Sequence, residues 1–183
     1  MKEIPNPSQM LLEGRPEGAS GTCVACVMEG TRPVLAEVQA LVTKTSFNVP
    51  RRASDGFDFN RAVLLMAVME KRAGLQLNLV DAYINVIGGL RLDEPAADLP
   101  VALAVASSYR DSAIADDLVA IGEVGLTGEI RSVSNMTQRL SEVARLGFSK
   151  VIIPKFGSEK LEIPDGLTVY RVRNIREAIE VAM

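Results

Sequence analysis

The residue that raises the first chemical question is Asp98, which precedes a run of small apolar residues in the stretch LDEPAADLPVALAVASSYR. The run predicts a helix, and a carboxylate at its start can accept hydrogen bonds from the free N–H groups of the first turn. Pro100 fits there because the first turn does not need its missing donor. A helix start of this kind can also present a nucleophile. Asp98 is therefore a helix cap or the occupant of a reactive position.

A second group of residues with chemical potential is cationic and surrounds one loop: Lys44, Arg51, Arg52 and Arg61. Cationic side chains on a loop suit contacts with the phosphates of nucleic acid. Phe47 lies in the same loop, where it can stack on a base or anchor the loop to the core. The alternative is that Asp55 and Asp58 pair with the two neighbouring arginines and form a solvated or interfacial ion-pair loop.

Two further pairs carry weaker signals. Glu123 and Glu129 flank a glycine-containing turn, so they could perform acid/base work or hold a metal, or pair across strands or with a neighbouring subunit. Cys23 and Cys26 form a CxxC within a strand-like stretch, where side chains three apart point to opposite faces and cannot share a zinc ion or a disulfide. The sequence holds no histidine, which excludes Ser-His-Asp and Cys-His sites.

Composition indicates one well-packed domain. The 183 residues are 48% hydrophobic and 23% charged, which is ordinary for a globular protein. A net charge of −3 provides no overall attraction for nucleic acid, so any such binding must come from a local patch. No segment reads as a membrane span or a signal peptide, and we expect a cytoplasmic protein without a membrane partner.

The pattern of elements predicts an α/β layered sandwich with a mixed sheet. Residues 1–18 are proline-rich and polar and are expected to form a tether to something upstream, whereas residues 19–183 form the domain. The domain is expected to begin with a hairpin and to continue with strands that alternate with helices. Asp58 is the expected cap of the helix that ends at Gly74, and the segment between the hairpin and this helix is expected to be a loop.

The stretch IGEVGLTGEIRSVSNMTQRLSEVARLGFSKVIIPK resembles the proteolytic domain of Lon proteases. The resemblance implies the Lon proteolytic-domain fold and a Ser-Lys dyad. An ungapped comparison of the motifs places Asp98 at the serine and Thr137 at the lysine, and the base is not transferred to Lys150 or Lys155, which lie beyond the motif. Neither residue present can play the role of its counterpart, because the dyad needs a hydroxyl beside an amine. We therefore expect no peptidase activity, and these two positions mark a relic dyad.

The whole chain is similar to the C-terminal Lon-like domains of the bacterial RadA (Sms) DNA repair family. The segments NPSQMLLEGRPEGASGTCVACVMEGTRPVLAEVQALV, FNVPRRASDGFDFNRAVLLMAVMEKRAG and EPAADLPVALAVASSYRD carry this resemblance. It implies that residues 1–18 connect to an upstream ATPase, and that ATP, Mg²⁺ and Zn²⁺ belong to missing N-terminal domains, with no cofactor or metal in this one. No G-x-x-x-x-G-K-[ST] loop occurs here.

The resemblance also implies a role in DNA recombination and in the response to DNA damage. The full-length family protein is a DNA-dependent ATPase and helicase that drives branch migration, and this domain itself is not an enzyme. The implied partners are further copies of the chain in a hexameric ring, single-stranded or branched DNA, and a recombinase. Lys44, Arg51, Arg52 and Arg61 are the expected DNA contacts. The alternatives are an oligomerisation scaffold without DNA contact and a peptidase with an altered site.

Overall fold

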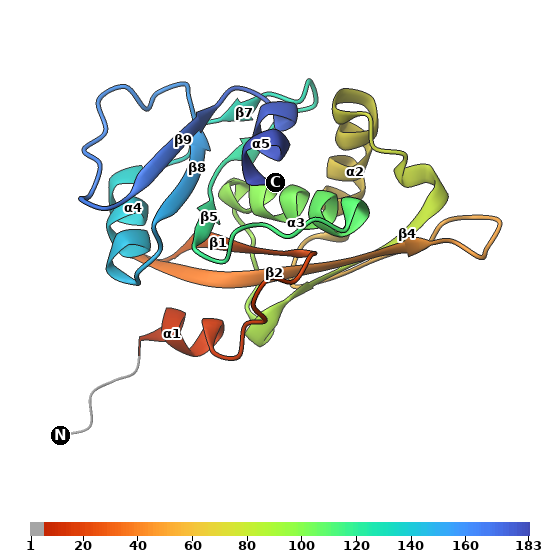
Figure 1. The fold of residues 1–183 in the computed structure, drawn as a ribbon, viewed down its shortest axis with the longest axis horizontal. Coiled ribbons are helices and arrows are strands. Elements are labelled where there is room, and N and C mark those ends of the chain that lie inside the picture. The colour runs from red at the N-terminus through yellow and green to blue at the C-terminus, as the bar shows by residue number, and fades with distance from the viewer. Residues whose placement is uncertain (1–5) are drawn as a thin grey trace.

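The computed structural model describes residues 6–183 and centres on one mixed β-sheet (Figure 1). Its strand order is β3-β4-β2-β1-β5-β8-β9, and β6 and β7 form a separate two-stranded sheet. The strands are β1 (Thr22–Glu29), β2 (Arg32–Lys44), β3 (Arg52–Asp55), β4 (Val80–Val86), β5 (Leu118–Ala120), β6 (Glu123–Val124), β7 (Ile130–Arg131), β8 (Lys150–Pro154) and β9 (Thr168–Val172). The helices are α1 (Pro7–Leu12), α2 (Phe59–Ala73), α3 (Asp98–Arg110), α4 (Met136–Arg145) and α5 (Ile175–Ala182), with 3-10 helices η1 (Leu77–Leu79), η2 (Ile87–Gly89) and η3 (Pro95–Ala97).

The predicted hairpin is the centre of the sheet. β1 and β2 pair antiparallel with Ala25 opposite Ala36, and β2 continues antiparallel to β4. β1 also pairs parallel with β5, and β5, β8 and β9 follow in parallel. A strand that is covered on both faces needs apolar side chains in both directions, as the nearly continuous apolar run of β1 supplies.

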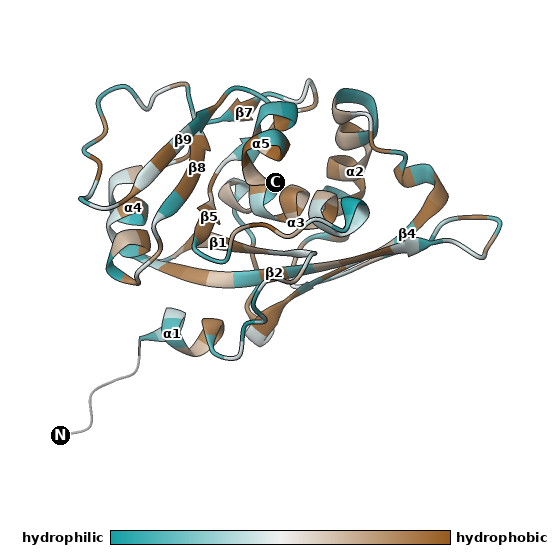
Figure 2. Cartoon of the chain, in the orientation of Figure 1, coloured by the Kyte–Doolittle hydropathy of each residue, from teal (hydrophilic) through white to brown (hydrophobic). Residues whose placement is uncertain are grey.

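Helices cover both faces of the sheet, so the predicted α/β layered sandwich with a mixed sheet is confirmed. One core lies between the sheet and α2, α3 and α5, and the other lies under α4. Helix α3 is apolar along most of its length and buried almost throughout, and it lies against the sheet under α5 (Figures 1 and 2). Its small side chains allow this close packing, and its first residue is thereby held at a fixed place beside the sheet.

The two cysteines lie on opposite faces of β1, as predicted. Cys23 belongs to the core beneath α3, whereas Cys26 belongs to the core beneath α4. Burial raises the pKa of each thiol to about 12, so both remain protonated at neutral pH. They serve as small apolar side chains in two separate cores.

Two segments differ from the sequence-based expectation. Residues 52–55, expected to be loop, form the edge strand β3 parallel to β4. This strand has only four residues and alternates between exposed and half-buried positions, so it carries no apolar periodicity that would reveal it. Within the expected tether, residues 7–12 form α1, and the Ser8 hydroxyl accepts a hydrogen bond from the Leu35 N–H (2.9 Å). Residues 1–5 of the expected tether lie outside the described residues.

The links around α2 are as predicted. Asp58 caps this helix by accepting from the Arg61 N–H (2.9 Å), and Gly74 ends it in the left-handed conformation. Gly56, between β3 and α2, has a φ of 86°, and a Cβ there would lie 2.9 Å from the Leu90 carbonyl oxygen. The close backbone approach explains why a glycine occupies this turn.

Candidate functional site

Asp98 is buried at the first position of α3 and does not cap the helix as predicted. The 3-10 helix η3 runs directly into α3, so Asp98 itself has helical backbone angles and its N–H bonds the Pro95 carbonyl. Its carboxylate turns away from the helix and accepts from the Val124 N–H of β6 (3.1 Å) and the Arg61 Nε of α2 (3.0 Å). The side chain therefore connects three elements rather than ending one.

Arg61 satisfies this carboxylate with two donors. Besides the Nε contact, its Nη2 bonds Asp98 Oδ2 and also donates to the Val124 carbonyl (2.8 Å). The hydrogen bond to the Asp98 carboxylate raises the pKa of the Arg61 guanidinium, so this guanidinium stays charged. Arg61 was expected to contact DNA, but its guanidinium is committed to α3 and β6 and its side chain is 32% exposed.

Thr137 is not among the residues that line the cavity around Asp98. It is exposed on the first turn of α4, and no hydrogen bond between the two side chains occurs among residues 6–183. The buried charged residue of α4 is Arg139, which pairs with Glu94 and donates to the Cys26 carbonyl (2.7 Å). Sequence reasoning did not identify Arg139, because nothing distinguishes a buried arginine in an amphipathic helix from a solvated one. The position that the resemblance assigns to the base thus holds an exposed threonine, which has no amine to accept a proton.

We call the cavity around Asp98 the Asp98 pocket; it has a volume of about 350 Å³. Its lining residues are Phe57, Asp58, Arg61, Leu92, Asp93, Glu94, Pro95, Asp98 and Glu123. Four of its carboxylates already have partners: Asp58 caps α2, and the others pair with Arg91, Arg139 and Arg61. In the described part of the chain, no group of three or more His, Cys, Asp or Glu side chains is placed to hold a metal ion. The Asp98 pocket thus contains a carboxylate that is bonded to Arg61 and Val124, where a Ser-Lys peptidase needs a free hydroxyl.

The remaining cations border the segment that we call the β2–β3 loop, residues 45–51. Lys44, at the end of β2, and Arg51, just before β3, are exposed, and neither makes an ion pair within residues 6–183. The Arg51 guanidinium lies 3.7 Å from the centre of the Phe47 ring, and the Arg51 N–H donates to buried Asp81 (2.7 Å). The backbone is therefore held while the two charges face solvent.

Arg52 has a different role from its neighbour. Its guanidinium donates to the Val80 carbonyl at the start of β4 and to the Leu77 carbonyl in η1, so it connects β3 to the segment around the start of β4. The alternative ion pairs with Asp55 and Asp58 do not form among the described residues. Of the four predicted contacts, Lys44 and Arg51 remain available to an anionic ligand, whereas Arg52 and Arg61 are occupied within the fold.

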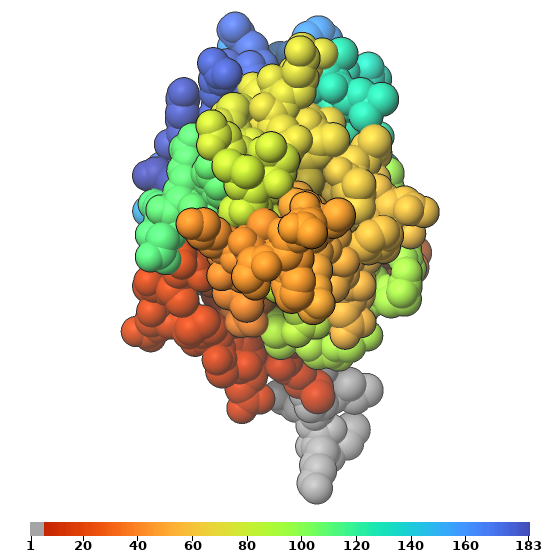
Figure 3. Space-filling model, turned by 90° about the vertical axis from the view of Figure 1, so that its right-hand side faces the viewer, coloured from red at the N-terminus to blue at the C-terminus, as the bar shows by residue number. Residues whose placement is uncertain are grey.

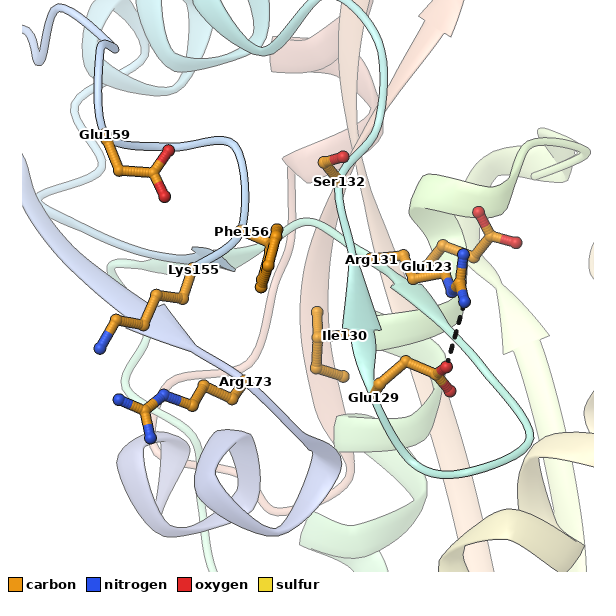
Figure 4. Close-up of a pocket in the computed structure, with 9 residues that line it drawn as sticks. All are labelled: Glu123, Glu129, Ile130, Arg131, Ser132, Lys155, Phe156, Glu159 and Arg173. Atoms are coloured by element: carbon orange, nitrogen blue, oxygen red, sulfur yellow. Dashed lines mark hydrogen bonds and ion pairs between the residues drawn. The ribbon is translucent and has the colours of Figure 1, made fainter.

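A larger cavity of about 820 Å³ lies near the ends of β6, β7, β8 and β9 (Figure 4). Its lining residues are Glu123, Glu129, Ile130, Arg131, Ser132, Lys155, Phe156, Glu159 and Arg173. Three carboxylates and three cations balance one another there. Glu129 pairs with Arg131 (3.4 Å), and hydrogen bonding from Thr127 lowers the pKa of this carboxyl. Glu129 thus pairs along its own segment rather than across strands, and Glu123 makes no ion pair among the described residues. The exposed Phe156 at its edge was not identified from the sequence.

Comparisons with known proteins identify a family and several relatives of the chain. Residues 65–156, which run from within α2 to just after β8, match the family described as subunit ChlI of Mg-chelatase. The whole chain is 50% identical to the DNA repair protein RadA of Halalkalibacterium halodurans over 40% of that protein. It is 51% identical over 178 residues, 97% of the chain, to 42% of RadA from Streptococcus pneumoniae. It is 51% identical over 181 residues, 99% of the chain, to 40% of RadA from Listeria monocytogenes. The chain spans about two fifths of the length of these curated relatives.

Proposed function

The chain belongs to the domain family described as subunit ChlI of Mg-chelatase and corresponds to the C-terminal part of bacterial RadA proteins, and on this premise we propose that it serves DNA repair. In this proposal it is a non-proteolytic Lon-like domain with two tasks. It holds the subunits of a ring together, and it contacts DNA through Lys44 and Arg51. The branch migration of recombination intermediates, driven by ATP, belongs to the whole protein, as does the recombinase partner.

The observation that carries the DNA contact is the β2–β3 loop. Lys44 and Arg51 present two charges to solvent from a loop whose backbone is hydrogen-bonded to Asp81 and to the Leu79 carbonyl. No aspartate or glutamate occurs between residues 44 and 54, although the chain as a whole has a net charge of −3. A concentrated positive patch of this kind suits phosphate contacts, which need no base sequence.

A ring strengthens such a patch. Two cations on one subunit bind phosphates weakly, but the same loop repeated around a ring binds one DNA molecule several times. Nucleotide and metal cofactors would be held outside this chain, whose sequence contains no G-x-x-x-x-G-K-[ST] loop. We further propose that the protein acts in the cytoplasm; no helix within residues 6–183 is long and apolar enough to span a bilayer.

The Asp98 pocket supports the non-proteolytic part of the proposal. Acyl transfer by a Ser-Lys pair requires a hydroxyl whose proton passes to a nearby amine. Here the corresponding carboxylate is bound to Arg61 and the Val124 N–H, and Thr137 lies exposed outside the pocket. We expect no cleavage of casein by the purified chain, and cleavage that disappears in Asp98→Ala would contradict this.

The DNA contact is tested by fluorescence anisotropy with single-stranded and duplex DNA at several salt concentrations. We expect Lys44→Ala/Arg51→Ala to lower the affinity about tenfold and to reduce the slope of log K against log salt by about two, because each lost phosphate contact removes about one unit. The matched control is Lys155→Ala/Arg173→Ala, which removes two exposed cations from the charge-balanced cavity.

Light scattering on the same samples separates the two tasks. If the loop variant keeps its size and loses DNA affinity, the loop is a phosphate contact. If the variant instead changes its oligomeric size while the wild type binds no DNA, the loop is a subunit contact and the domain is a scaffold alone. Equal loss of affinity in the loop variant and the control would mean that charge at any position suffices, which contradicts a specific patch.

A further inference from the structure

The tip of the β2–β3 loop combines its two cations with exposed apolar side chains. Phe47 is 45% exposed and Val49 is 75% exposed, and Leu79, which is 56% exposed, lies in η1, from which the Leu79 carbonyl bonds the Thr45 N–H. The loop forms the right-hand tip of the molecule in Figure 1 and projects toward the viewer in the space-filling view of Figure 3. Exposed apolar side chains that cluster at a protruding tip are unfavourable in water and are typical of a surface that a ligand covers.

The loop is held in shape without that ligand. The Thr45 N–H donates to the Leu79 carbonyl (3.3 Å), and the Phe47 N–H donates to the Thr45 hydroxyl (3.1 Å). At the other end, the Arg51 N–H donates to Asp81, which is buried in β4 (2.7 Å). Because three hydrogen bonds fix the backbone, Phe47 is presented to solvent in a defined orientation.

The Phe47 ring is prepared for stacking. The Arg51 guanidinium covers one face at 3.7 Å, which is a cation–π contact, and nearly half of the side chain stays open to solvent. A planar group placed on the open face would complete a stack of guanidinium, phenyl ring and ligand. Nucleic acid bases are the planar groups that aromatic side chains hold in this way, and the phosphates beside them suit Lys44 and Arg51.

The charge of the loop selects among possible ligands. Residues 44–54 carry only positive charges, and the Asp81 carboxylate that holds the loop is buried, so an acidic ligand is favoured over a neutral peptide. An intact duplex offers phosphates outside and stacked bases inside, so it satisfies the cations but cannot cover the ring. An unpaired nucleotide offers a phosphate to the cations and an exposed base to the Phe47 ring. Apolar wedges and stacking rings are the usual means by which proteins hold unstacked bases.

We propose that Phe47 stacks on an unpaired DNA base at a single strand or strand junction, with Lys44 and Arg51 on the flanking phosphates. This proposal rests on the proposed function, because it assigns the DNA structure that the same loop recognises. The loop then distinguishes unpaired from paired DNA by contact with the ring, whereas the charges alone bind both.

The first test compares Phe47→Ala with wild type on single-stranded, forked and duplex DNA. We expect an affinity loss of about tenfold for the single strand and the fork, because base stacking on an aromatic ring supports an effect of this size, and a loss of less than about twofold for the duplex. The matched control is Phe156→Ala, which removes another exposed phenylalanine beside exposed cations, in the cavity of Figure 4. It is expected to change none of the three affinities.

The second test uses the absence of tryptophan from the sequence. Phe47→Trp and Phe156→Trp each introduce one tryptophan, whose emission falls when a base stacks on the indole. We expect quenching of Phe47→Trp by the single strand and the fork but not by the duplex, and no quenching of Phe156→Trp. Unfolding and light-scattering measurements confirm that the variants keep their fold and size.

The outcomes separate the two proposals. If Lys44→Ala/Arg51→Ala weakens all DNA binding but Phe47→Ala and Phe47→Trp show no difference between DNA forms, the DNA contact stands and the stacking proposal is wrong. Equal losses of Phe47→Ala on duplex and single strand also overturn it, as does a change of oligomeric size. If the charge variant leaves DNA binding intact, the proposed DNA contact itself fails, and the stacking proposal fails with it.

Discussion

The ion pair of the Asp98 pocket is bonded within the fold, whereas the two cations that border the β2–β3 loop, Lys44 and Arg51, are exposed to solvent. In the pocket, the charges of Asp98 and Arg61 are satisfied by each other and by the backbone of Val124. In the loop, Lys44 and Arg51 make no ion pair among the described residues, although aspartates are near in sequence. A satisfied pair holds the fold together, whereas an unsatisfied exposed charge remains available to a ligand. The position that the Lon resemblance assigns to a nucleophile holds a structural ion pair, whereas the proposed DNA contacts border the β2–β3 loop.

The largest effect is expected when the carboxylate of the Asp98 pocket is removed. Asp98→Ala leaves a half-buried guanidinium and the Val124 N–H without their partner, so we expect the free energy of unfolding to fall by about 3 kcal/mol. Urea unfolding measures it, and DNA affinity should not change. The control is Asp93→Ala, which removes an exposed ion pair and should cost less than about 1 kcal/mol. A loss below 1 kcal/mol for Asp98→Ala would mean that the pair is not structural.

Arg52 lies beside the β2–β3 loop, but its charged group is bonded within the fold, as the Arg61 guanidinium of the Asp98 pocket is. Its guanidinium bonds two backbone carbonyls, so Arg52→Ala should lower the free energy of unfolding by about 1.5 kcal/mol. DNA affinity should fall less than twofold. The adjacent Arg51→Ala provides the contrast: we expect a stability change within about 0.5 kcal/mol and a clear loss of DNA affinity. If Arg51→Ala lowered the stability and Arg52→Ala lowered the DNA affinity, Arg52 would be the DNA contact and Arg51 the structural residue.

The smallest expected effect is at Thr137, the second relic position. Its side chain is exposed on α4, and Thr137→Ala should change the free energy of unfolding by no more than about 0.5 kcal/mol. Gln138→Ala, an exposed neighbour on the same helix, should behave alike. A larger loss at Thr137 alone, measured by the same urea unfolding, would indicate that this position still contributes to a site.

Sequence reasoning predicted the elements whose pattern is local and strong. The β1–β2 hairpin, the cap by Asp58, the stop at Gly74 and the strand β8 depend on residues close together in the chain, so periodicity and capping reveal them. Strand β3 escaped because its pairing with β4 depends on residues far along the chain and because neither of its faces is apolar.

The sequence supplied the residue types of the candidate site but not their partners. It has an aspartate and a threonine at the two positions that the Lon resemblance assigns to a Ser-Lys dyad. The contact between Arg61 and Asp98 could not be predicted from the sequence, since these residues are 37 positions apart and come together only through the packing of α2 on α3. Likewise, Arg51 and Arg52 are adjacent in sequence, and only the backbone geometry at β3 sends one side chain to solvent and the other to carbonyl groups.

The Arg61–Asp98 pair has a consequence for substitutions at either of its two positions. Restoring a serine at Asp98 alone would strand the Arg61 charge, and neutralising Arg61 alone would strand the carboxylate; each single step passes through a less stable protein. A base at Thr137 would be a third change. The two charges are therefore coupled: a serine at position 98 would be tolerated only together with a neutral residue at position 61, and a Ser-Lys dyad would need all three substitutions at once.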